Sequence, residues 1–98
     1  MKFDITDIKK PLVIDLYQNM LKSRMIEEKM ITLLRQGKIS KWFSGIGQEA
    51  ISTGLTLALE KDDFILPMHR NLSVFTSRKI PLIKLFAQWQ GKEEGFTK

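Results

Sequence analysis

Apolar residues recur at three- and four-residue spacing after Pro11 and stop before Gly37, which predicts one long amphipathic helix over residues 11–37. Proline suits the first helical turn, where its missing N–H costs nothing, and glycine suits the left-handed position that ends a helix. The periodic positions are Leu12, Leu16, Met20, Ile26, Met30, Leu33 and Leu34. Three further apolar residues widen the stripe: Leu21, Met25 and Ile31. A stripe of this width predicts that the helix packs against more than one other element.

Shorter helices are predicted in the second half of the chain. Residues 48–59 form a helical pattern rich in small side chains, which let another backbone approach closely. Gly54 lies inside this pattern, where glycine costs about 1 kcal/mol relative to alanine unless close packing requires it. Residues 71–77 predict another helix, and a last one begins at Pro81 and stops at Gly91.

The segment FILP, residues 64–67, is an apolar run ended by proline, typical of a short buried strand or an extended segment. We detect no internal repeat and no low-complexity linker. The sequence therefore predicts a mainly α chain that forms a single helical fragment over residues 1–98. Its parts are an N-terminal arm (1–10), the long helix (11–37), and a region of loop, helices and one short strand (38–98).

Composition narrows the function classes. A chain of 98 residues forms one domain at most, and its formal charge of +5 favours acidic partners or phosphates. The basic residues are scattered, which disfavours nucleic acid as a partner. The absence of cysteine excludes disulfides and thiolate catalysis and fits a cytoplasmic location. The charged N-terminus lacks the apolar core of a signal peptide. The sequence also contains no apolar run long enough to predict a membrane span.

Residues 45–50, GIGQEA, match the loose glycine pattern that opens dinucleotide-binding folds. The context differs, because a long helix precedes the glycines where those folds have a strand. Glu49 would also place a negative charge where the phosphate binds. The sequence favours a tight turn followed by a helix whose first-turn glutamate complements the helix dipole.

Other motifs favour structural roles. Asp62 and Asp63 are adjacent and point to opposite faces of an extended chain, so a solvated turn is expected. The sequence has one histidine, no cysteine and no convergent carboxylates, so we expect no metal site within this chain. No serine or threonine lies in the sequence context of a catalytic nucleophile. Trp42 and Phe43, beside a glycine-rich turn, are expected to close a hydrophobic pocket or to pack against the rest of a larger protein.

His69 and Arg70 form the strongest candidate site. The arginine supplies a fork of donors that matches phosphate or carboxylate oxygens, and the imidazole adds a donor or shuttles a proton. Their position just before a predicted helix suits an anion site. The alternative is an arginine paired with a local carboxylate beside a structural histidine, and the residues alone leave both interpretations open.

Several blocks of the sequence, in order and spacing, resemble the start of the α subunit (or the α half of a fused α/β chain) of the E1 component of 2-oxo acid dehydrogenases. These are the thiamine-diphosphate-dependent enzymes of the pyruvate and branched-chain type. The resemblance extends from residue 12 to the end of the chain. Its specific combination is RQGKI at 35–39, GQEA at 47–50, and R-x-x-x-x-x-x-x-R-x-I-P-L from Arg70 to Leu82.

The resemblance implies roles for particular residues. The arginine at the Arg70 position binds the cofactor diphosphate, and His69 replaces a tyrosine that reaches the same cofactor in many members. The loop before GQEA borders the substrate entrance, which places Trp42, Phe43 and Ser44 near the side chain of the 2-oxo acid. The Gly-Asp-Gly and Asn-Asn motifs that hold Mg²⁺ in the family are absent here. Thiamine diphosphate and Mg²⁺ are therefore expected of the complete enzyme, with no metal ligand and no catalytic residue in this chain.

The implied fold is the helical N-terminal portion of a thiamine-diphosphate-binding α/β fold, ending before its parallel sheet. The implied function is oxidative decarboxylation of a 2-oxo acid with acyl transfer to lipoamide. Expected partners are the E1 β subunit or β half, the E2 lipoyl acyltransferase and the substrate, in a homo- or hetero-oligomer, without nucleic acid or membrane. The isolated chain is expected to be inactive. The alternative function is a small helical protein-interaction module without catalysis.

Overall fold

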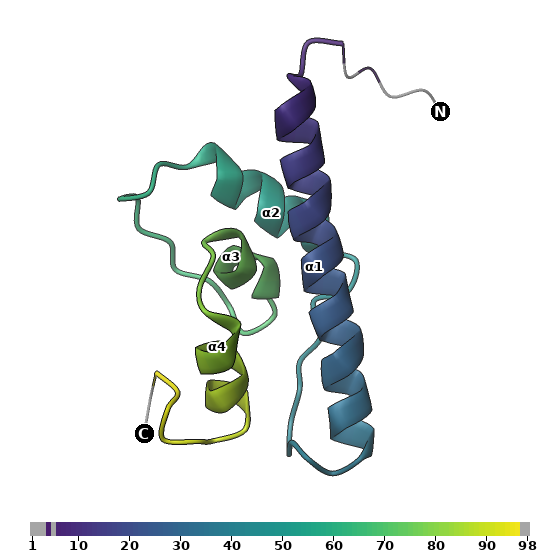
Figure 1. The fold of residues 1–98 in the computed structure, drawn as a ribbon, viewed down its shortest axis with the longest axis vertical. Helices are drawn as coiled ribbons and strands as arrows, with labels where there is room; N and C mark the ends of the chain where they lie inside the picture. The colour runs from purple at the N-terminus through teal and green to yellow at the C-terminus, as the bar shows by residue number, and fades with distance from the viewer. Residues whose placement is uncertain (1–3, 5, 97–98) are drawn as a thin grey trace.

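The structure, a computed structural model, describes residue 4 and residues 6–96. This part of the chain contains four α-helices and no strand, so the predicted mainly α fold is confirmed (Figure 1). The elements are α1 (Lys10–Arg35), α2 (Glu49–Ala58), α3 (Leu72–Ser77) and α4 (Leu82–Trp89).

Helix α1 begins and ends close to the residues that the sequence indicated. Pro11 lies in its first turn, and Gly37 beyond its end takes a φ of +73°. The N–H of Lys38 donates to the carbonyl of Leu33 over 2.9 Å, which satisfies one of the last helical carbonyls. This closure needs the left-handed conformation that glycine adopts without a Cβ clash.

Helix α1 runs along one side of the molecule, and α2, α3 and α4 lie on the other side (Figure 1). Helices α2 and α3 pack against α1 and against each other. The long helix therefore has more than one packing partner, as predicted, although Leu21 and Met25, which widen its apolar stripe, are 44% and 61% exposed. No helix in the described part of the chain is both long enough and apolar enough to cross a membrane.

The apolar core joins the C-terminal half of α1 to the following loop, α3 and α4. Its buried members are Ile26, Met30, Leu33, Ile39 and Leu72, and half-buried rings and side chains surround them: Trp42, Leu82, Phe86 and Trp89. The ring of Trp89 meets the rings of Trp42 and Phe86 edge-on, with centroids 5.0 and 5.4 Å apart. Edge-to-face contacts of this kind add to the energy of apolar burial. The aromatic cluster therefore ties α4 to the loop.

The contact between α1, α2 and α3 is made largely by small polar residues. Buried Ser73 of α3 donates its hydroxyl to the hydroxyl of Ser23 on α1 over 2.7 Å. Helix α2 buries Thr53 in this contact, whereas its apolar residues Ile51 and Leu55 are 72% and 57% exposed. Small side chains thus let these helices approach closely, as the composition of residues 48–59 predicts.

One expectation needs correction. Residues 64–67 form the extended segment and not the short buried strand, the two alternatives that the sequence left open, because no described segment pairs with their backbone, and Phe64 and Leu66 are 99% and 98% exposed. Close packing does not explain Gly54, because a Cβ built there meets no heavy atom within 4 Å. The small residues that do lie in the helix contact are its serine and threonines.

Candidate functional site

Glu27 lies on the buried face of α1 with 1% of its surface exposed. Both oxygens of its carboxylate accept hydrogen bonds from the loop that follows the helix. The indole Nε1–H of Trp42 donates to Oε2, and the backbone N–H of Gly45 donates to Oε1, each over 2.7 Å. Hydrogen bonds to an ionised acceptor are stronger than neutral ones, and burial strengthens them further. The Glu27 side chain therefore anchors the loop onto α1.

The pair His69–Arg70 lies in a tight turn that Asn71 closes before α3 begins. The backbone N–H of Asn71 donates to the carbonyl of Met68 over 3.1 Å. The side-chain Oδ1 of Asn71 accepts from the N–H of Met68 over 2.7 Å. Asparagine often closes turns with its side chain in this way. The two bonds hold the turn in a defined conformation.

Arg70 contacts the loop through both its backbone and its side chain. Its carbonyl oxygen lies so close to Gly45 that it would stand 2.2 Å from a Cβ at that position. Its Nη1–H donates to the carbonyl of Ser44 over 3.0 Å, and its guanidinium carbon lies 5.7 Å from the ring centroid of Phe43. The ring of His69 meets the same phenyl ring edge-on, with centroids 4.6 Å apart. The phenyl ring therefore contacts both members of the pair.

The fold brings the predicted cofactor and pocket residues into one place: Trp42, Phe43, Ser44, His69 and Arg70. Beside them lies an open pocket of about 350 Å³, lined by Lys41, Trp42, Phe43, Pro67, Met68, His69, Phe75 and Trp89. Ser44 and Arg70 lie outside the lining. Ser44 uses its carbonyl for Arg70 and its hydroxyl as acceptor for the N–H of Ile46, over 3.1 Å. Of the three residues predicted at the substrate entrance, the two aromatic ones therefore face the pocket.

The side chain of Arg70 is suited to an oxyanion. Arginine carries five N–H donors in a planar fork, and the bond to Ser44 uses one of them. The residue is exposed, and the attraction of its guanidinium to the face of the Phe43 ring favours one direction of the fork. The guanidinium therefore presents positive charge and oriented donors beside an aromatic pocket.

The GIGQEA segment is a turn followed by a helix, as its context predicts. The N–H of Gln48 donates to the carbonyl of Gly45 over 2.9 Å, and Gly47 takes a φ of +94°. Glu49 accepts from the N–H of Gly47 over 2.8 Å and from Nε of Arg24 on α1. The Arg24 hydrogen bond holds the pKa of the Glu49 carboxyl below its usual value, although burial opposes this shift. A carboxylate thus occupies the place where a dinucleotide phosphate would bind.

Asp62 and Asp63 lie in an exposed turn, as expected. The N–H of Glu60 donates to Oδ2 of Asp63 over 2.7 Å. The guanidinium of Arg78 donates to the backbone carbonyls of Lys61 and Asp63 over 2.8 and 2.9 Å. The two aspartates therefore belong to a loop that Arg78 holds in shape.

Comparison with known proteins shows the family of the chain. The model of the family described as "Dehydrogenase E1 component" matches residues 17–98. The chain belongs to this E1 dehydrogenase family. The match includes α1 from Tyr17 onward and the whole of the site around Arg70, so the family assignment covers the residues that carry the site.

Individual relatives of this E1-family chain are α subunits. The chain is 36% identical over 74 residues to the 2-oxoisovalerate dehydrogenase subunit alpha of Pseudomonas aeruginosa, covering 76% of the chain and 18% of the relative. It is 32% identical over 79 residues to the pyruvate dehydrogenase E1 component subunit alpha of Mycoplasma genitalium, covering 81% of the chain and 22% of the relative. It is 30% identical over 91 residues to the pyruvate dehydrogenase E1 component subunit alpha of Staphylococcus aureus, covering 93% of the chain and 25% of the relative. The chain thus spans no more than a quarter of these relatives. No solved structure matches it.

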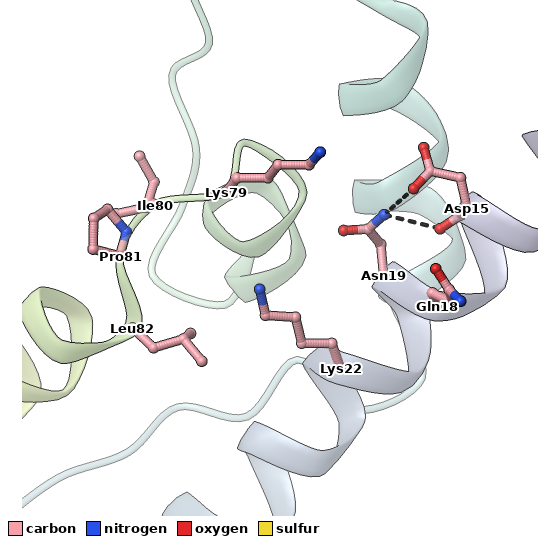
Figure 2. A pocket seen from close by; sticks show the side chains of 8 residues that line it. All are labelled: Asp15, Gln18, Asn19, Lys22, Lys79, Ile80, Pro81 and Leu82. Atoms are coloured by element: carbon pink, nitrogen blue, oxygen red, sulfur yellow. Dashed lines mark hydrogen bonds between the residues drawn. The ribbon is translucent and has the colours of Figure 1, made fainter.

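A second pocket of the E1-family chain, of about 440 Å³, lies between α1 and the turn that joins α3 to α4 (Figure 2). Lys22 from the helix and Lys79 from the turn extend into it (Figure 2). Asn19 donates its side-chain amide to the carboxylate of Asp15 over 3.0 Å and to the carbonyl of the same residue over 2.8 Å. None of the predicted cofactor or substrate residues lines this pocket. In the described part of the chain, no three His, Asp or Glu side chains gather as metal ligands would.

Sequence reasoning missed Glu27, which accepts hydrogen bonds from Trp42 and Gly45 in the loop of this E1-family chain. The signal was present in the helical pattern, because Glu27 lies four residues after Ser23 and three before Met30, on the face that α1 buries. A glutamate on a buried helix face requires hydrogen-bond donors from another element. The sequence does not show which element supplies them.

Proposed function

We propose that this chain is the N-terminal part of the α subunit, or α half, of a thiamine-diphosphate-dependent 2-oxo acid dehydrogenase E1 component. The reaction is oxidative decarboxylation of a 2-oxo acid, with transfer of the acyl group to lipoamide. One observation carries the proposal: in an E1-family chain, the exposed guanidinium of Arg70 is held over Phe43 beside an aromatic pocket. Relatives named as α subunits of pyruvate and 2-oxoisovalerate dehydrogenases support it.

Arg70 binds the diphosphate of thiamine diphosphate through the donors that Ser44 leaves available. His69, packed on Phe43, supplies one further donor to the same group. When bound, thiamine diphosphate supplies the electron sink for decarboxylation, while the protein positions it and neutralises its phosphates. Mg²⁺ completes the diphosphate site with ligands from outside this chain.

Trp42 and Phe43 border the substrate entrance, with Ser44 behind them as a carbonyl acceptor for Arg70. The substrate is pyruvate or a branched-chain 2-oxo acid, and the names of relatives, which give pyruvate and 2-oxoisovalerate, support this. The partners are an E1 β subunit or β half and the E2 lipoyl acyltransferase, in a homo- or hetero-oligomer. The exposed side chains of Phe64 and Leu66 support contact with further protein. The location of the complete enzyme is the cytoplasm.

The direct test of the Arg70 role is titration of the chain with inorganic diphosphate, followed by ¹H–¹⁵N NMR. A single oriented arginine should give a Kd on the order of 1 mM, without micromolar binding. Arg70→Gln should abolish the titration. Arg35→Gln, which removes the same charge from an exposed residue at the end of α1, should leave it unchanged. Equal binding by Arg70→Gln and the parent chain would overturn the proposal.

A second measurement separates the fragment from the complete enzyme. Calorimetry of the chain with thiamine diphosphate and Mg²⁺ should detect no micromolar binding and no turnover of 2-oxo acids, because the metal ligands are absent from this sequence. Micromolar binding would show that the chain holds a complete cofactor site. The enzyme assignment itself is tested by reading the gene beyond Lys98 for the Gly-Asp-Gly and Asn-Asn motifs.

The second candidate function is a helical interaction module without catalysis. The apolar side chains that α2, α4 and the 64–67 loop expose favour it, including Ile51 at 72% and Ile83 at 82% exposure. Sedimentation equilibrium of the chain distinguishes the two functions when combined with the diphosphate titration. Self-association without Arg70-dependent anion binding would favour the module.

A further inference from the structure

Glu27 is an unusual residue for its place. It is as deeply buried as the core methionine Met30 on the next turn of α1, with 1% and 0% of their surfaces exposed. A buried carboxylate is destabilising unless donors satisfy it. Here both oxygens have donors, and both donors come from the loop before α2. The carboxylate therefore contributes to the position of that loop.

A short series of contacts leads from Glu27 to the guanidinium of Arg70. The carboxylate accepts from Gly45, and the Arg70 carbonyl packs against the same glycine so closely that no Cβ fits. The neighbouring carbonyl of Ser44 accepts from Nη1 of Arg70. The ring under the guanidinium belongs to Phe43, between Trp42 and Ser44 in the loop that the carboxylate holds. The guanidinium of Arg70 therefore contacts Phe43 and Ser44. These two residues lie in the sequence between Trp42 and Gly45, which are the two donors to Glu27.

We propose that Glu27 is a positioning residue for the anion site, setting the direction of the Arg70 fork through the loop. This role rests on the proposed function, in which Arg70 binds a diphosphate. Glu27 does not touch the ligand. It holds the Ser44 carbonyl and the Phe43 ring where they orient the guanidinium before an anion arrives, so that binding does not have to order the side chain.

The variant Glu27→Gln tests this role because it keeps the size and shape of the side chain. An amide offers one acceptor oxygen in place of two, so either the Trp42 indole or the Gly45 N–H loses its partner. Glu28→Gln is the matched control, since it makes the same change on the next residue, which is exposed. Trp42→Phe removes the indole donor and leaves Glu27 intact. This variant replaces Glu27→Gln as the test if the glutamine variant does not fold.

Two readouts are followed by ¹H–¹⁵N NMR of the chain: the Arg70 Nε–H resonance, assigned with Arg70→Lys, and the Trp42 indole resonance, assigned with Trp42→Phe. Glu27→Gln should shift both resonances and weaken binding of inorganic diphosphate about tenfold. Trp42→Phe should shift the Arg70 resonance in the same direction. Glu28→Gln should change neither the resonances nor the affinity. The thermal midpoint of each variant is measured in parallel, so that loss of folding is separated from loss of positioning.

The outcomes separate this inference from the proposed function. An unshifted Arg70 resonance in folded Glu27→Gln overturns the positioning role, whether or not diphosphate binds. Arg70-dependent binding that Glu27→Gln leaves at the parent affinity also overturns it, and leaves the proposed function standing. If the parent chain binds no diphosphate, the proposed function fails. A shifted Arg70 resonance would then still establish that the carboxylate orients the arginine.

Discussion

Gly45 and Arg70 are in direct backbone contact. The carbonyl oxygen of Arg70 stands 2.2 Å from the position that a Cβ on Gly45 would take, and Oε1 of Glu27 stands 3.2 Å from it. The loop and the turn that carry the candidate site can therefore meet only because residue 45 has no side chain.

Gly45→Ala should destabilise the chain and displace Arg70. The added methyl group overlaps a backbone atom, which cannot rotate away as a flexible side chain does. We expect the free energy of unfolding to fall by about 2–3 kcal/mol, at the upper end for overpacking of a buried site. Urea unfolding followed by circular dichroism measures this, and an unchanged midpoint would contradict the close contact.

Gly54→Ala should have the opposite effect. This glycine lies inside α2, and a Cβ there meets no heavy atom within 4 Å. Alanine loses less backbone entropy on folding into a helix, so the free energy of unfolding should rise by about 0.5–1 kcal/mol. The same urea titration measures it, and a loss of stability would show that α2 has a close neighbour at this position.

Met30→Ala should be among the most destabilising core substitutions. Met30 is fully buried between the residues of the apolar core, and its truncation leaves a cavity. The expected loss is about 2–5 kcal/mol. Met25→Ala on the same helix is the matched control, because Met25 is 61% exposed and its truncation should change stability by less than about 0.5 kcal/mol. Similar losses in both variants would contradict the assignment of the buried face.

The ion pair of Glu49 with Arg24 should make stability depend on pH in the acid range. The pKa of Glu49 is lower in the folded chain than its usual 4.5, chiefly because of the hydrogen bond from Arg24. Below 4.5 the unfolded chain therefore binds this proton more readily than the folded chain does. The stabilisation is complete above pH 4.5 and is lost as the pH falls through the folded value.

Glu49→Gln reports on this pair. At neutral pH it should lower the free energy of unfolding by about 1 kcal/mol, the range for a hydrogen bond to a charged group that is partly screened by water. The difference from the parent chain should narrow at pH values below 4.5. Glu94→Gln, at an exposed position, provides the control for the change of net charge. A constant difference at all pH values would show that the carboxylate does not titrate with folding.

The long helix shows how much of this fold is local. Three signals predict this helix: Pro11, the three- and four-residue spacing, and Gly37. Each involves only residues in the same or an adjacent helical turn, and the helix forms at Lys10–Arg35. The same holds for the turn before α2, where the position of Glu49 relative to the glycines already argued against a phosphate site. Local signals are reliable here because backbone hydrogen bonds within a helix or turn join residues close in sequence.

Burial was harder to predict than helix position. The apolar run at 64–67 left a short buried strand and an extended segment open, and the extended segment forms because a strand needs a neighbour for its backbone, which the described chain does not offer. Helix α2 has one polar and one apolar face, and periodicity does not say which of them meets α1. The polar face packs because its small side chains allow close approach, and the apolar face stays exposed.

The sequence by itself determined the helical class of the chain, its family resemblance and the candidate pair His69–Arg70. Only the tertiary structure decided that the loop from Trp42 to Gly45 lies against that pair and that Glu27 holds it there. The physical reason is the distance along the chain between the partners. Such contacts follow from how α1, the loop and the turn pack together, and no local period or cap encodes them.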